Sequence, residues 1–154
     1  MYNIRDVAET VLSFESVTHK KLQKLCYYIC AWHYTVFNIE ICDAEFEAWV
    51  HGPVSPELYY QYKKYGWGLI NQTKDSALPY RKVEFIKNIL NIYGGLDADQ
   101  LEDMTHDESP WKNARKGLSK WAHSDNKISN EDIYNYYTNE KRDIFNHLQM
   151  MYSQ

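Results

Sequence analysis

The chain has 154 residues, with 17 Lys and Arg against 21 Asp and Glu and a formal net charge of −4. This length suits a single domain, residues 1–154, that buries enough surface to fold without a metal or a disulfide framework. A hydrophobic share of 44% excludes wholesale disorder, and the acidic balance disfavours a nonspecific nucleic-acid binder. No apolar run approaches the roughly 20 residues that span a bilayer, and no signal peptide is evident at the start. We therefore expect a cytoplasmic protein that does not bind membranes.

Two helices are predicted in the first 40 residues. Hydrophobic side chains recur at three- and four-residue spacing from Ile4 to Leu12, which is typical of an amphipathic helix. Thr18 is a good N-cap for a second helix, which we expect to end near Asn38. On this second helix we expect three lysines to lie near water: Lys20, Lys21 and Lys24.

A small β element is predicted next. Residues 44–50 alternate polar and apolar side chains and are the best strand candidate. The Gly52-Pro53 pair is expected to break this strand, and Ser55-Pro56 to start a helix that closes at Gly66. Residues 67–70 are predicted to form a short strand that pairs with residues 44–50.

The second half of the chain is predicted to be helical. Its segments are residues 83–93, a short helix capped by Asp97, a helix from Ser109 to Trp121, and a last stretch over residues 129–148. The expected fold is mainly α, one compact domain of six to seven helices with a small β element near residues 44–50 and 67–70.

Charge is unevenly distributed in this half. Residues 97–108 contain six acidic residues and no Lys or Arg, whereas residues 112–127 contain five bases and one acid. This pattern suits either helix-dipole complementarity on a solvated face or a bipolar surface that orients a charged partner.

Metal binding and catalysis are the first chemical alternatives. Cys26, Cys30 and His33 share one helical face, and Cys42 could join them, but structural zinc sites usually take ligands paired on turns. These side chains also complete an apolar stripe, so we expect them to pack in the core, and we expect neither a metal nor any other cofactor. No complete catalytic motif is present, and His106 among its acidic neighbours is more typical of a helix end. We therefore expect that the chain is not an enzyme.

DNA binding is a further alternative. Thr18 to Lys24 place three lysines near a helix start, but only Gln23 could read base edges there. A DNA-binding regulator is therefore disfavoured.

Two proline-containing corners are not explained by core packing. In the first, Gly52-Pro53 and Pro56 form a stiff bend flanked by Trp49, His51 and Tyr59. Such a bend is either a structural corner or a preformed contact surface with little ordering cost on binding. The second corner runs from Thr105 to Trp111.

Three separated blocks resemble a known family. They are Lys21-Leu22-Gln23-Lys24-Leu25-Cys26-Tyr27-Tyr28 with Ala31-Trp32-His33, Glu47-Ala48-Trp49 with Gly52-Pro53-Val54 and Pro56, and Thr105-His106 with Pro110-Trp111. In this order and spacing they resemble the Panacea antitoxin domain, also called the SocA-like domain, over roughly residues 4–145.

The resemblance implies an antitoxin of a bacterial or phage toxin–antitoxin pair. Its implied partner is a cognate protein toxin, usually encoded by the adjacent gene and neutralised by direct binding. The SocA type acts instead as an adaptor that delivers its toxin to the ClpXP protease, and a phage accessory protein is a further alternative. Many members carry a DNA-binding segment before this domain, which we do not expect here.

The corners and the resemblance together predict two sets of residues. The expected partner-binding residues are Trp49, His51, Gly52, Pro53, Val54, Pro56, Tyr59 and His106. The expected motif or structural residues are Leu22, Lys24, Leu25, Tyr28, Trp32, Thr105, Pro110 and Trp111.

Overall fold

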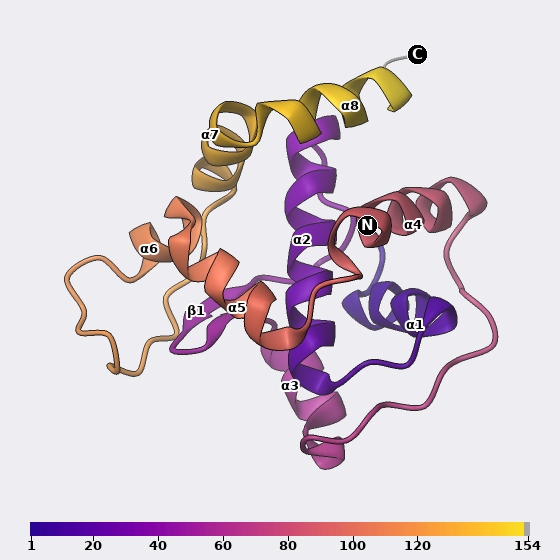
Figure 1. Cartoon of the computed structure of the whole chain (residues 1–154), viewed down its shortest axis with the longest axis horizontal. Coiled ribbons are helices and arrows are strands. Elements are labelled where there is room, and N and C mark those ends of the chain that lie inside the picture. The colour runs from indigo at the N-terminus through magenta and orange to yellow at the C-terminus, as the bar shows by residue number, and fades with distance from the viewer. Residues whose placement is uncertain (153–154) are drawn as a thin grey trace.

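The longest helix, α2 (His19–Phe37), stands at the centre of the fold, as the computed structural model of residues 1–152 shows (Figure 1). Helices α1 and α4 lie on one side of α2, α5 lies on the other, and α7 and α8 cross its C-terminal end. Within residues 1–152 no helix is both long enough and apolar enough to cross a bilayer. The bounds of the other helices are α1 (Ile4–Phe14), α3 (Pro56–Tyr62), the 3-10 helix η1 (Lys63–Tyr65), α4 (Tyr80–Tyr93), α5 (Ala98–Asp107), α6 (Ser109–Ala114), α7 (Asn130–Glu140) and α8 (Arg142–Tyr152).

Local capping sets the bounds of α2. The Thr18 side chain accepts a hydrogen bond from the Lys21 backbone N–H at 3.3 Å, and Asn38 ends the helix in the left-handed conformation with φ of 55°. Every residue from 22 to 29 is buried, because other elements cover the helix on all sides. The predicted helix between Thr18 and Asn38 is confirmed.

The core beside α2 is aromatic, and its polar atoms are paired. The Trp32 indole N–H donates to the Tyr93 hydroxyl at 2.8 Å. Tyr28 stacks on Tyr93 with ring centroids 4.1 Å apart, and all three side chains are at most 1% exposed. Large rings whose polar atoms are satisfied form a rigid core on which surface elements can be held in fixed positions.

The β element is a hairpin of β1 (Glu47–Trp49) and β2 (Gly52–Val54). A strand within the predicted residues 44–50 is confirmed, although it is shorter, Glu47–Trp49. Its predicted partner at 67–70 is wrong, because the antiparallel partner is the segment expected to break the strand. Residues 69 and 70 instead meet the chain just before α2: Leu69 forms a bridge with Thr18, and the Ile70 N–H donates to the Val17 carbonyl at 2.9 Å.

Proline is tolerated in β2 because its strand partner bonds elsewhere. Pro53 lies opposite Ala48, whose N–H donates to the Asn126 carbonyl at 2.8 Å. The Ala48 carbonyl accepts from the Arg115 guanidinium at 2.9 Å. The missing N–H of Pro53 therefore costs the hairpin no ladder bond.

Two predicted helical segments differ from their expected bounds. The helix from Ser109 ends at Ala114 rather than continuing to Trp121, because the buried guanidinium of Arg115 gathers the following loop by donating to three of its carbonyls. The stretch over residues 129–148 divides at Lys141 into α7 and α8. The described residues thus hold eight α-helices instead of six to seven, in the mainly α fold that the sequence predicts.

Candidate functional site

A groove of about 670 Å³ opens beside the first turns of α2. Its walls come from α2, the β1–β2 hairpin, the segment from α3 to Trp67, and the start of α5. We call it the aromatic groove, and the lining residues that matter most below are His19, Lys24, Trp49, His51, Tyr59 and Trp67.

Four of the eight expected partner-binding residues line the aromatic groove. These are Trp49, His51, Val54 and Tyr59. Gly52 and Pro53 are buried in the hairpin, Pro56 is half-buried at the start of α3, and His106 belongs to the neighbouring corner. The structure thus brings half of the set to one surface, and direct partner contact by these residues stays a prediction.

Aromatic rings form the apolar wall of the groove. Trp49 and Tyr59 are half-buried, with ring centroids 5.0 Å apart, and His19 lies 5.4 Å from Tyr59. The Trp49 indole N–H donates to the Glu47 carboxylate at 2.8 Å, which fixes the ring. Trp67 lies at the groove with 90% of its surface exposed. Half-buried rings in mutual contact, such as Trp49 and Tyr59, are typical anchors of protein interfaces.

The hairpin is seated on α2 through Gly52. This residue has φ of +113°, and a Cβ there would meet the Lys24 Cε at 2.7 Å and the Thr105 Oγ1 at 3.0 Å. The Lys24 ammonium donates to the Pro53 carbonyl at 3.4 Å. Only glycine satisfies both the backbone conformation and the close approach.

A second clamp holds the end of the hairpin. The Gln23 side-chain amide donates to the Ser55 carbonyl at 3.0 Å, and its oxygen accepts from the Ser55 N–H at 2.9 Å. The Ser55 hydroxyl in turn accepts from the Leu58 N–H to cap α3. The bend predicted to be stiff is therefore fixed to α2 by side chains from two consecutive positions.

Lys24 itself is buried, and the prediction that it lies near water is wrong. It is 2% exposed, because the hairpin and α5 cover this part of α2. Burial lowers the pKa of its ammonium to about 7, although the Glu102 carboxylate acts in the opposite direction. Lys20 and Lys21 remain partly exposed.

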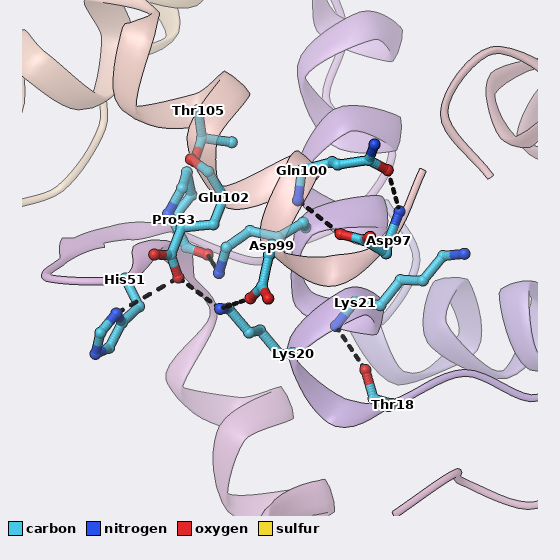
Figure 2. Close-up of polar contacts among 11 residues, drawn as sticks. Thr18, Lys20, Lys21, His51, Pro53, Asp97, Asp99, Gln100, Glu102 and Thr105 are labelled. Atoms are coloured by element: carbon cyan, nitrogen blue, oxygen red, sulfur yellow. Dashed lines mark hydrogen bonds and ion pairs between the residues drawn. The ribbon is translucent and has the colours of Figure 1, made fainter. Parts of the chain in front are cut away.

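The first turns of α2 and α5 are joined by charge, as Figure 2 shows. The Lys20 ammonium lies 2.8 Å from both the Asp99 and the Glu102 carboxylates, and His51 Nδ1 lies 3.4 Å from Glu102. Burial acts to raise the pKa of Glu102, but the hydrogen bond and the charge of Lys20, together with smaller contributions from His51 and His106, outweigh burial and lower the pKa. Part of the acidic run, for which a solvated face and a partner-orienting surface were the two alternatives, therefore pairs with α2. These ion pairs lie next to the Asp97–Gln100 capping box drawn in the same figure.

The second corner supports the hairpin from the other side. The Trp111 indole N–H donates to the Trp49 carbonyl at 2.8 Å, and His106 stacks on Trp111 with centroids 4.2 Å apart. Burial lowers the pKa of His106. This arrangement makes the corner a buttress for Trp49, placing His106 behind the groove wall.

A family model matches residues 22–112, and its description is "Antitoxin SocA-like, Panacea domain". The match covers more than half of the chain. The chain belongs to this family. Searches of curated proteins and of solved structures found no match.

The matched region of this Panacea domain contains both corners and the whole hairpin. The expected structural residues on α2 are buried throughout: Leu22, Lys24, Leu25, Tyr28 and Trp32. In the second corner Thr105 and Pro110 are buried and Trp111 is half-buried. The sequence blocks that resemble the Panacea domain therefore coincide here with the framework that shapes the groove.

Sequence reasoning missed His19, Lys20 and Trp67 as parts of the site. Trp67 lies between Gly66 and Gly68, and a large ring in so flexible a context is one signal that could have found it. The roles of His19 and Lys20 depend on α3 and α5, which lie far away in sequence.

Glu108 was also missed, and it joins three elements of the Panacea core. The Tyr28 and Tyr137 hydroxyls donate to the same oxygen of its carboxyl group at 3.1 and 2.6 Å. Burial raises its pKa to about 7, although both hydrogen bonds act in the opposite direction. Glu108 is thus a buried structural carboxyl group that ties α2 and α7 to the start of α6.

The cysteine and histidine side chains considered above as metal ligands make other contacts in the structure. The Cys30 and Cys42 sulfurs lie 3.5 Å apart as free thiols, while His33 Nδ1 contacts the Ile39 carbonyl at 2.7 Å. In the part of the chain that the structure describes, no group of three or more His, Cys, Asp or Glu side chains is arranged to hold a metal ion.

Because Lys24 has a pKa near 7 in the native protein and an ordinary value of 10.5 once unfolded, it makes stability depend on pH. Between these values only the unfolded chain binds the proton, so the native state gains stability as pH rises. We expect the unfolding free energy of the wild type, relative to Lys24→Met, to rise from pH 7 to 9.5 by up to about 1.4 kcal/mol per pH unit. Urea denaturation at each pH measures it, and a flat difference would contradict the burial of a neutral amine.

Gly52→Ala should destabilise the protein by about 2–4 kcal/mol, since it adds backbone strain and a clash with Lys24. Gly95→Ala is the matched control, because a Cβ there meets no atom within 4 Å, and it should change stability by less than about 0.5 kcal/mol. Equal unfolding free energies for the two variants would show that the hairpin is not seated through Gly52.

Proposed function

We propose that this Panacea chain neutralises a protein toxin by binding it directly through the aromatic groove, without catalysing a reaction. Family membership supports an antitoxin role. The observation that carries the proposal is a preformed apolar surface, in which Trp49 and Tyr59 are fixed and Trp67 projects into solvent.

The rigidity of this surface favours binding. The hairpin beneath Trp49 is held by Lys24, Gln23 and Trp111, so little conformational entropy remains to be lost when a partner docks. Aromatic side chains on such a frame carry most of the binding free energy in protein interfaces. The remaining groove residues would supply shape and polar contacts.

The proposal includes a choice of partner and mechanism. The toxin is expected to be the product of the adjacent gene, and it is held as a stoichiometric complex of two proteins. Blockade by binding needs no third component, whereas delivery to ClpXP would require the protease. An assay with purified proteins therefore tests the direct mechanism.

Trp67→Ala should weaken binding of the adjacent gene product at least tenfold, because truncation removes an exposed ring from the groove. Trp121→Ala is the matched control: Trp121 is 71% exposed and lies outside the groove, so its loss should leave the Kd unchanged. Isothermal titration of purified toxin measures both values. Equal effects of the two substitutions, or no complex with the wild type, would refute the proposal.

A further inference from the structure

Two nitrogen groups in the aromatic groove have unused hydrogen-bonding capacity. The Lys24 ammonium has one long bond, to the Pro53 carbonyl at 3.4 Å, and His19 Nε2 has no partner within residues 1–152. Both residues line the groove although they are only 2% and 8% exposed. Buried polar atoms without full partners cost free energy, and a ligand that supplies acceptors recovers it.

The neighbouring charges favour an anionic ligand. Three lysines line the groove, Lys20, Lys24 and Lys63, against one acidic residue, Asp99. Asp99 is held by Lys20, and Glu102 is shared between Lys20 and His51. No carboxylate on the chain is therefore in ion-pair contact with Lys24 among the described residues, so this nitrogen is free to pair with an incoming carboxylate.

The surroundings favour a carboxylate over a phosphate. Lysine binds both carboxylates and phosphates, but the paired donors that arginine offers to a phosphate are missing, because no arginine lines the groove. Trp49 and Tyr59 line the same groove and offer apolar contact to the polypeptide that carries the carboxylate.

We propose that His19 and Lys24 recognise an Asp or Glu side chain of the protein partner, presented next to a large apolar side chain that packs on Trp49 and Tyr59. This inference rests on the proposed function and specifies the chemistry of the toxin segment. The groove therefore selects a toxin segment in which an acidic residue stands beside a large apolar residue.

Two blocked tripeptides test this recognition without the toxin. Acetyl-Leu-Glu-Phe-amide should bind the full chain about tenfold more tightly than acetyl-Leu-Gln-Phe-amide, measured by NMR titration at millimolar concentration. Lys24→Met should abolish the preference for the acidic peptide. Lys87→Met, which changes an exposed lysine outside the groove, should keep the preference.

His19→Phe provides a second variant should Lys24→Met fail to fold, and it should also reduce the preference for the acidic peptide. Three results would overturn the inference. The wild type could bind both peptides with equal affinity, it could bind neither, or inorganic phosphate could displace the acidic peptide more readily than acetate does. Toxin binding is measured separately. A wild-type chain that binds toxin but shows no acidic preference refutes this inference alone, whereas a chain that binds no toxin refutes the proposed function.

Discussion

The position of the hairpin on α2 depends on one close contact, between the bare Cα of Gly52 and the side chain of Lys24. Because Gly52 has no Cβ, the Lys24 chain can pass beneath it and bond the Pro53 carbonyl. Trp49 pairs with Gly52 across the hairpin, so the same contact fixes where the ring stands in the groove. The shape of the candidate binding surface therefore depends on the contact of the hairpin with α2.

The contact with Gly52 leaves the Lys24 amine buried, with little access to water. Burial lowers the pKa of Lys24 to about 7, and Glu102, whose charge acts against this shift, is already engaged with Lys20 and His51. A protein keeps such a group at a cost in stability. In this account the cost is tolerated because the nitrogen serves recognition, while the surrounding rings provide apolar contact.

Local features of the fold could be predicted from the sequence, whereas long-range ones could not. Thr18, Asp97 and Ser129 cap helices through bonds to residues three positions ahead, and such spacing is visible in the sequence. The partner of strand 47–49 and the burial of Lys24 depend on contacts made by distant segments, and periodicity carries no information about them. Four of the predicted binding residues meet in one groove because one short corner holds them, but His106 turned out to lie behind the wall, stacked on Trp111.

The most direct measurement of the central claim is ¹⁹F NMR of the chain labelled with fluorotryptophan at its five Trp positions and titrated with the purified toxin. The account predicts that the Trp49 and Trp67 resonances shift or broaden at one equivalent, while that of the exposed Trp121 stays unchanged. A complex that perturbs Trp121 and leaves both groove tryptophans unaffected would contradict it.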